Sequence, residues 1–583
     1  MPKQSVEQVK AESQGLRGEI GRTLGSDATR FSEEDATLLK FHGTYQQDDR
    51  DRRKGATTGD KAWMFMVRTK MPGGELTAAQ YIAHDDLAGS LGNSTLRLTT
   101  RQGIQLHGVL KGDLRETIAQ IRAAGLTTWG ACGDVVRNTM APAAPIADAV
   151  HAEVHRFARS LSERFLARSR AYSEIWFKGE RVPIEPEPAA ADGETDPIYG
   201  EVCLPRKFKI GIAVPPQNDV DIYSQDLGFV PFAPHGEIEG YTVLVGGGFG
   251  MTHGIHSTFP TLAQPLFYVR REDAVETAVA VVTTQRDHGN RTDRKRARLK
   301  YLIEDRGLEW FRGEVTQRLG QWRTFEPKVI EFSTVADRLG WHEQGDGRWF
   351  YGVQVPGGRI LDQDDTRYRS AFRAVAERFG FTLRLTPNTN LLLTNIEPDQ
   401  RESLERTLRA FGVPDPGGLS ALRRVAHACV ALPTCGLALA ESERILPSLL
   451  DGIDEVLRDL DLTDEPILFR MTGCPNGCAR PYNADFSLVG RAPGKYALFV
   501  GGSIAGDRLA GLEQKTVATA DVPAVVRGYL EEFVREREND ETFSAYWGRT
   551  HVNGPAPHPQ QFHLELAERA ARAESRIEVV FAE

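Results

Sequence analysis

The sequence predicts an α+β fold that is built from an internally duplicated unit. Two segments, residues 63–110 and 349–396, share one order of features: a strand-like run, a Pro-Gly-Gly turn, a stretch of helical length and a strand beginning L-R-L-T. Pro-Gly-Gly between such runs is turn chemistry. Each copy is too small to bury its own apolar face, so we expect the two copies to pair about a pseudo-twofold axis.

A weaker repeat lies outside these two segments. Residues 240–248 (GYTVLVGGG) and 495–502 (KYALFVGG) are both strand-like runs that end in glycines. These glycines lack the spacing of a dinucleotide-binding loop, and no acidic residue is placed to support one, so a tight turn and a functional loop stay open as alternatives. The chain therefore divides into two related halves, near residues 60–320 and 345–540.

Length and composition describe a folded protein of several domains. The chain has 583 residues, of which 40% are hydrophobic and 26% charged, and its formal net charge is −9. A negative chain has no overall attraction for nucleic acid, so an anionic partner must meet a local basic patch. No apolar run reaches the roughly 18 residues of a membrane span. Residues 1–20 lack the apolar core of a secretory signal, so we expect a cytoplasmic protein.

Four cysteines form two close pairs, Cys429 with Cys435 and Cys474 with Cys478. In a long cytoplasmic chain, clustered cysteines indicate a metal or catalytic site rather than a disulfide framework. Four thiolates suit either tetrahedral zinc or an iron–sulfur cluster. The gap inside the first pair is wide for structural zinc, and proline and glycine in both pairs form tight loops. The sequence therefore favours a cluster over zinc.

The second constellation is cationic. Arginine and lysine recur inside short motifs: the residues are Arg68, Arg97, Arg101, Arg137, Arg206, Lys207, Lys209 and the run 291–300, which includes Arg298. Any one of these alone is more often a solvated side chain. Alternate residues of a strand share a face, however, so Arg101, Gln105 and His107 are expected on one side. Because buried unpaired charge is costly, inward-facing cations imply an anionic cofactor, an anionic substrate or both.

These motifs resemble those of the sulfite reductase hemoprotein family, whose members carry siroheme and a [4Fe–4S] cluster and include ferredoxin-dependent nitrite reductases. The motifs that carry the resemblance are KFHGTYQQDDRD at 40–51, LRLTTRQGIQLHG at 96–108, GDVVRNTMAPAAP at 133–145, LPRKFK at 204–209 and TGCPNGCARP at 472–481. The resemblance covers residues 35–540 and is closest to the ferredoxin-linked and hemoprotein-subunit sulfite reductases.

The resemblance implies a sulfite/nitrite reductase fold, in which paired ferredoxin-like half-domains join two siroheme- and cluster-binding α+β domains. The expected divisions are an N-terminal extension (1–60), a first ferredoxin-like half-domain (61–130), a siroheme- and substrate-binding domain (131–335), a second ferredoxin-like half-domain (336–416), a [4Fe–4S]- and siroheme-binding domain (417–545) and a C-terminal tail (546–583). Residues 183–197 are expected to form an exposed loop.

The resemblance also implies roles for individual residues. The cluster ligands are Cys429, Cys435, Cys474 and Cys478, and Cys478 additionally bridges to the siroheme iron. The side chains that hold siroheme are Arg97, Thr99, Arg101, Gln105, His107, Arg206, Arg298 and Asn388. The side chains that bind the substrate anion are Arg68, Arg137, Lys207 and Lys209. In the second copy, Asn388 occupies the position that Arg101 occupies in the first. The first copy therefore has a cationic side chain at this position and the second a neutral one.

The implied reaction is the six-electron reduction of sulfite to sulfide. Arginines would orient the anion, and Lys207 or Lys209 would act as general acid. Two lysines favour the sulfite dianion over nitrite, with ferredoxin-dependent nitrite reduction as the alternative. An alternative from another class is a zinc-stabilised, non-catalytic anion-binding protein. Electrons are expected from a partner, ferredoxin or a flavoprotein reductase subunit, because no flavin or nicotinamide domain is recognisable.

Two further expectations concern the surroundings of the site. An acidic ferredoxin would need a basic docking face, for which the basic residues between 50 and 54 and the run 291–300 are candidates. Some relatives link a tyrosine to a cysteine near siroheme, and Tyr45 and Cys132 lie in the matching motifs.

Overall fold

The computed structural model describes residues 4–55, 61–168, 175–177, 180–182, 196–253, 255, 257–320 and 323–552. The predicted loop at 183–197 lies outside these ranges except for its last two residues, and residues 553–583 of the predicted tail lie outside them as well. In the described part of the chain, no helix is both long and apolar enough to cross a membrane.

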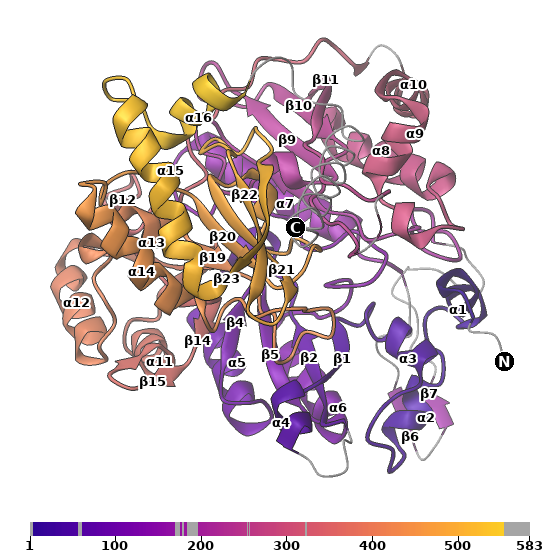
Figure 1. Ribbon diagram of the computed structural model, residues 1–583. Coiled ribbons are helices and arrows are strands. Elements are labelled where there is room, and N and C mark those ends of the chain that lie inside the picture. Colours follow the sequence, from indigo (N-terminus) through magenta and orange to yellow (C-terminus); the bar gives the residue numbers. More distant parts are fainter. Residues whose placement is uncertain are drawn as a thin grey trace, which may run out of the picture.

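Two five-stranded sheets form the two predicted half-domains. The first runs in the order β1 (Thr44–Asp48), β2 (Trp63–Arg68), β5 (Ile104–Val109), β4 (Leu96–Leu98) and β14 (Arg359–Ile360). The second runs β12 (Gly340–Glu343), β13 (Trp349–Val353), β18 (Leu391–Ile396), β17 (Thr382–Leu385) and β3 (Glu75–Leu76). Their helices, along the bottom and left side of Figure 1, are α5 (Ala78–Ser90), α6 (Leu114–Ala123), α11 (Tyr368–Phe379) and α12 (Arg401–Ala410).

The two half-domains exchange a short strand. Strand β14 of the second copy pairs with β4 in the first sheet, and β3 of the first copy pairs with β17 in the second sheet. A Pro-Gly-Gly turn precedes each exchanged strand, and a Cβ on Gly74 (φ +74°) would lie 2.5 Å from the Leu385 carbonyl oxygen. A Cβ on Gly358 (φ +73°) would likewise lie 2.8 Å from the Leu98 carbonyl oxygen. Only glycine fits this crossing, and the exchange confirms the predicted pairing of the copies.

Two mixed sheets complete the fold, one in each half. The first contains β11 (Gln264–Arg270), β10 (Gly240–Val245), β9 (Leu227–Phe232) and β8 (Ile210–Ile212). The second contains β19 (His427–Ala428), β20 (Phe469–Thr472), β21 (Phe486–Ala492), β22 (Lys495–Val500) and β23 (Gly511–Ala518). In both, a parallel pair (β8–β9 or β20–β21) is followed by an antiparallel strand (β10 or β22). The weaker repeat is therefore confirmed.

Helices cover these mixed sheets (Figure 1). In the first half they are α7 (Ala149–Arg164), α8 (Ala274–His288), α9 (Leu299–Arg306) and α10 (Leu308–Leu319). In the second half they are α13 (Ala421–Val425), α14 (Leu446–Asp459), α15 (Val522–Glu536) and α16 (Phe543–His551). Amphipathic α14 illustrates the cause: its apolar residues recur at helical spacing, so that Leu446, Leu450, Ile453 and Leu457 are all buried in one core.

Two elements pack across expected domain boundaries. Strand β1 lies before the boundary at residue 60 and pairs with β2 in the first sheet. Helix α16 crosses the boundary at 545 and buries Tyr546 and Trp547 in the core of the second half. The domain division itself stays a prediction. The remaining N-terminal elements are α1 (Val6–Glu12), α2 (Ile20–Leu24), α3 (Glu33–Leu38) and α4 (Arg50–Gly55).

Candidate active site

The two cysteine pairs leave the sheet at neighbouring strand ends. Strands β19 and β20 are parallel, and their last residues, Ala428 and Thr472, lie directly before the Cys429 loop and the Cys474 loop. The carboxyl ends of parallel neighbours lie at one edge of a sheet, so the loops meet. The backbone N–H of Gly473 lies 3.3 Å from the Cys429 sulfur, and the side-chain amide of Asn476 lies 3.4 Å from the Cys474 sulfur.

The four thiols are electrostatic neighbours. Burial raises the pKa of Cys429, Cys435 and Cys474, and the charge of Cys478 raises each of them further. Within the described residues, however, no group of three or more His, Cys, Asp or Glu side chains is placed to hold a single metal ion. Four mutually close thiols suit an iron–sulfur cluster, which thiolates ligate. N–H groups directed at sulfur are also usual around such clusters.

Lys207 and Lys209 form the core of the cationic group. Both precede β8, lie deep in the molecule and keep part of their surface accessible. Among the described residues, neither ammonium group makes a hydrogen bond or an ion pair. Burial and then the charges of Arg206 and Arg298 lower the pKa of Lys207 to about 7. Burial, Lys207 and Arg298 lower the pKa of Lys209 well below its ordinary value. Unpaired buried cations of this kind fit an anionic ligand.

Cys478 connects the thiols to the cations. The Thr100 hydroxyl, at the end of β4, donates to the Cys478 carbonyl at 3.0 Å. The Cys478 thiol also acts on Lys207, where it opposes the other charges and raises the pKa. The cysteine loops of the second half and the cationic loops of the first half therefore share one site.

Two buried nitrogen atoms beside this site have no hydrogen-bond partner in the described structure: Arg101 Nε and His107 Nδ1. The other guanidinium nitrogens of Arg101 donate to Gln225 Oε1 at 2.8 Å and to the Asn138 carbonyl at 2.6 Å. Burial and the charge of Arg359 lower the pKa of His107 well below its usual value, so its imidazole is neutral and can donate from one nitrogen. These orphaned polar atoms fit a large polyanionic group such as siroheme.

Arg68 and Arg137 belong to a second hydrogen-bonded group. Arg68 Nη1 donates to the Cys132 sulfur at 2.9 Å, and the Tyr45 phenol is hydrogen-bonded to both Cys132 and Arg137. Burial opposes the charge of Arg137, but Tyr45 and Cys132 outweigh burial and raise its pKa, so Arg137 stays cationic. With its amide turned to satisfy the network, Gln105 accepts from Arg68 Nε at 3.0 Å. The crosslink between Tyr45 and Cys132 stays a prediction.

Three predicted siroheme residues make hydrogen bonds within the protein. Arg298 forms a bidentate ion pair with Asp226. Asn388 donates to the Val335 carbonyl at 2.8 Å and accepts from Arg480 at 2.6 Å. The Thr99 hydroxyl accepts the backbone N–H groups of residues 101 and 103, which holds the loop that presents Arg101. These hydrogen bonds hold the three side chains in place, and their contact with siroheme stays a prediction. Arg206 lies 3.8 Å from Asp134 and remains partly accessible.

Arg97 also makes hydrogen bonds within the protein. Its Nε donates to Glu443 at 2.9 Å and its Nη2 donates to the carbonyl of Ala428, the residue before Cys429, at 2.8 Å. Glu443 in turn donates its backbone N–H to the Cys429 carbonyl at 3.1 Å. Arg97 therefore supports the Cys429 loop from both sides, directly at Ala428 and through Glu443, and its predicted contact with siroheme stays a prediction.

We expect Arg97→Met to reduce the iron and acid-labile sulfide content of the purified protein. Loss of a buried, charge-assisted hydrogen-bond donor destabilises a protein by about 1–3 kcal/mol, and here the loss falls on the Cys429 loop. Arg384→Met is the matched control: Arg384 holds the same repeat position but contacts Glu75 and His155. Equal iron content in the two variants would contradict a role at the cluster loop.

Sequence reasoning missed several residues of the site. Lys300 lies in the basic run but was not singled out; its ammonium donates to the carbonyls of Gly248 and Gly250 at 2.9 and 3.1 Å. Asp226 and Glu443 were missed because the sequence reasoning did not consider carboxylates that pair with the buried arginines. A useful signal would have been that so many buried cations need internal counter-charges as well as a ligand.

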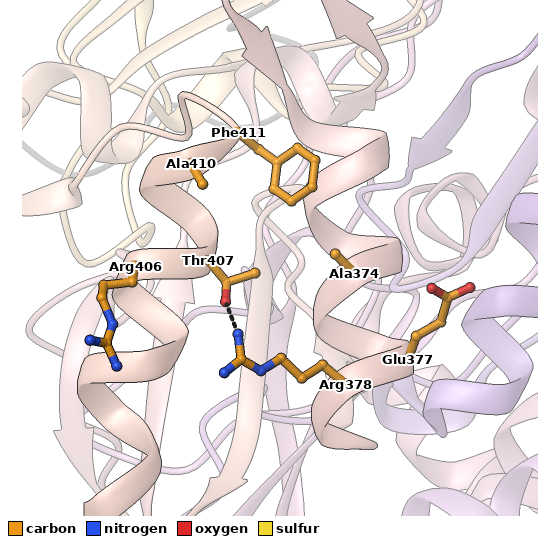
Figure 2. A pocket seen from close by; sticks show the side chains of 7 residues that line it. All are labelled: Ala374, Glu377, Arg378, Arg406, Thr407, Ala410 and Phe411. Atoms are coloured by element: carbon orange, nitrogen blue, oxygen red, sulfur yellow. Dashed lines mark hydrogen bonds between the residues drawn. The ribbon is translucent and has the colours of Figure 1, made fainter.

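A surface pocket lies far from this site. It is a shallow depression between α11 and α12, and Figure 2 shows Arg378 donating to Thr407 across it. Its lining residues are Ala374, Glu377, Arg378, Arg406, Thr407, Ala410 and Phe411. It contains none of the predicted site residues, so we assign it no part in the chemistry.

Known proteins share both the sequence and the fold. Residues 59–124 and 342–411 match the family described as "Nitrite/Sulfite reductase ferredoxin-like half domain", and residues 163–322 match "Nitrite and sulphite reductase 4Fe-4S domain". The "Sulfite reductase [NADPH] hemoprotein beta-component" of Geobacillus kaustophilus is 43% identical over 565 residues, which is 96% of this chain and 98% of that protein. The chain belongs to the nitrite and sulfite reductase family. The Bacillus subtilis protein of the same name is 42% identical over 561 residues, 96% of this chain and 97% of its own.

A solved structure shares the same fold. The structure of Mycobacterium tuberculosis NirA aligns with a TM-score of 0.76 at 22% identity, and the alignment covers 95% of this chain and 97% of that one. The predicted nitrite/sulfite reductase fold with ferredoxin-like half-domains is therefore confirmed. The segment that matches the family's 4Fe-4S domain lies in the first half, whereas the four cysteines at 429–478 lie in the second. The duplication explains this, because both halves contain the same type of mixed sheet.

Proposed function

We propose that this chain is the hemoprotein component of a sulfite reductase and reduces sulfite to sulfide with six electrons at a siroheme joined to a [4Fe–4S] cluster. The observation that carries the proposal is the junction at Cys478. There, four neighbouring thiols adjoin Lys207 and Lys209, two deep ammonium groups that have no protein partner among the described residues. The relatives named above are sulfite reductase hemoproteins along almost their whole length.

The side chains divide the work by their chemistry. Cys429, Cys435, Cys474 and Cys478 would hold the cluster, and the bound siroheme and cluster would supply the electrons. Arg137 stays charged and can orient a sulfite oxygen, as can Arg68. The sulfite oxygens leave as water, so protons must be delivered.

Lys207 is the side chain best suited to deliver those protons. Its lowered pKa, about 7, lets an ammonium group give up a proton near neutral pH. Arginine cannot take this role, because it remains protonated.

The electron donor is also part of the proposal. The curated relatives are named as an NADPH-dependent beta-component, which supports an NADPH-linked flavoprotein partner; ferredoxin is the alternative. Arg50, one of the predicted docking residues, instead donates to the carbonyls of Gly436 and Ala438 at 2.8 Å and so supports the Cys435 loop. Leu437 in that loop is 68% exposed, which leaves the cluster region accessible to a donor. The side chains of residues 53 and 54 lie outside the described part of the chain.

The test is a comparison of substrates on the purified holoenzyme with an artificial reductant. We expect a coloured protein with heme-like absorption bands and a higher kcat/KM for sulfite than for nitrite. Lys209→Asn should lower kcat/KM for sulfite more than for nitrite, by about tenfold, because a dianion loses more than a monoanion when one cation is removed.

Two results would overturn the proposal. A much higher kcat/KM for nitrite than for sulfite would make the chain a nitrite reductase. A colourless protein that binds stoichiometric zinc would leave only the non-catalytic anion-binding alternative.

A further inference from the structure

Asp226 is a buried carboxylate at the centre of the cationic group. It is fully buried and immediately precedes β9, as Lys209 immediately precedes the parallel neighbour β8. One carboxylate oxygen, Oδ1, accepts from Arg298 Nε at 3.0 Å and from Arg298 Nη2 at 2.8 Å. The other, Oδ2, accepts from Arg298 Nη2 and from the backbone N–H of Lys209, both at 2.9 Å. One carboxylate therefore fixes an arginine side chain and the main chain of a substrate-site lysine.

The second half contains the same carboxylate without the cations. Asp485 immediately precedes β21, and its Oδ2 accepts the backbone N–H of Leu468 at 2.9 Å. The next contact is also repeated: Gly246 donates its N–H to the Asp226 carbonyl at 3.0 Å, and Gly501 donates to the Asp485 carbonyl at 2.9 Å. The main-chain role is thus common to both halves.

The differences between the halves lie in the charges. Leu468 stands in the second half where Lys209 stands in the first. Asp485 Oδ1 has no hydrogen-bond partner in the described structure, whereas Asp226 Oδ1 is held by Arg298. Burial raises the pKa of Asp485 to about 7. The chain therefore separates the structural role of this aspartate, which both halves need, from an electrostatic role that only the first half has.

We propose that Asp226 is a positioning residue for the anion site: it anchors Arg298 and the Lys209 main chain, and its negative charge favours the protonated form of the Lys209 ammonium that would meet the substrate anion. This inference rests on the proposed function in one respect, the assignment of Lys209 to the substrate. Asp226 contacts no substrate itself and acts through its neighbours.

The charges around Lys209 fix the direction of the expected effect. Burial, Lys207, Arg298 and Arg101 all lower the pKa of Lys209, and Asp226 raises it. Loss of the Asp226 charge should lower the pKa of Lys209 further, so its ammonium would lose its proton at a lower pH. Loss of the Arg298 charge should do the opposite, since one of the lowering groups is removed while Asp226 remains.

The decisive experiment compares Asp226→Asn with Arg298→Gln. Both variants break the same buried ion pair. The readout is sulfite binding to the resting holoenzyme, followed by its absorption change, because binding tests the charge of Lys209 separately from proton delivery by Lys207. The proposal expects opposite shifts in the pH midpoint at which binding is lost on the alkaline side: about one pH unit down for Asp226→Asn and up for Arg298→Gln. If Asp226 had a purely structural role, the pH midpoint would shift in the same direction in both variants. Siroheme and iron content and Tm are recorded for each variant.

Asp485→Asn is the matched control, because it removes the equivalent carboxylate where neither lysine nor arginine is bonded to it. It should leave the pH midpoint unchanged, whatever its effect on Tm. Shifts of one sign in both ion-pair variants, or no shift, would overturn the proposal. If Asp226→Asn does not load its cofactors, Arg298→Gln alone decides: an unchanged or lowered midpoint refutes the role. If the wild type prefers nitrite, the proposed function fails but the same titrations with nitrite still test Asp226.

Discussion

Replacing Cys478 by serine is expected to abolish sulfite reduction while leaving the fold intact. Cys478 is an exposed residue whose carbonyl is held by Thr100 and whose thiol acts on Lys207, so it faces both the other cysteines and the cationic group. Loss of outer-shell partners of a metal site typically reduces activity by 10–100-fold. Loss of a ligand that also joins two centres should exceed that range, so we expect activity to fall by more than about a hundredfold.

The measurement should follow the cofactors as well as the rate. Iron, acid-labile sulfide, siroheme absorption and sulfite turnover are determined on the same preparation, and we expect the siroheme bands and the turnover to fall together. Cys203→Ser is the control, because Cys203 is buried and its pKa is raised to about 12 by burial, remote from any use as a thiolate. A Cys478→Ser enzyme with full activity would refute the bridging role.

The fold was predictable from local signals that repeat. Pro72-Gly73-Gly74 and its second copy require a left-handed turn and a close backbone crossing, both of which only glycine allows, so the motif is visible in sequence. In both L-R-L-T strands the two leucines are buried, Leu96 and Leu98 in the first half and Leu383 and Leu385 in the second. What could not be predicted is the exchange of β3 and β14 between sheets, because short edge strands have no distinctive composition.

The site was predictable where its residues lie in one short motif. It was not predictable where the hydrogen-bond partners of a residue are distant in the sequence. Each cysteine pair is close in the sequence, and so are Lys207 and Lys209. Their spacing alone therefore indicated a site. By contrast, Arg97 donates to Glu443, which lies 346 residues further along the chain. Arg298 donates to Asp226, which lies 72 residues before it. An arginine motif shows that a cation is present, but whether it meets a cofactor or a carboxylate depends on tertiary packing.

The proton donor makes the second large prediction. If Lys207, with its pKa lowered to about 7 by burial and neighbouring arginines, is the general acid, kcat/KM should fall as pH rises through about 7, because the ammonium then loses its proton. Lys207→Arg keeps the positive charge but cannot release a proton. We therefore expect KM for sulfite to stay close to the wild-type value and kcat to fall by about 10²–10⁴-fold. The residual activity of Lys207→Arg should no longer fall as pH rises through about 7. Lys207→Gln removes charge and proton together, so its KM should rise as well.

Lys70 supplies the control for this comparison. It is another buried lysine whose pKa is lowered by burial, to about 8, but its ammonium faces the Ser162 carbonyl on α7. Lys70→Gln should leave the pH profile unchanged even if Tm shifts. Because Lys207→Arg keeps the positive charge and Lys207→Gln removes it, while neither can deliver the proton, their KM values separate anion binding from proton delivery. A Lys207→Arg enzyme with near-normal kcat and the wild-type alkaline limb would show that the proton comes from elsewhere. Lys209, the other unpaired ammonium of the site, would then be the group to replace.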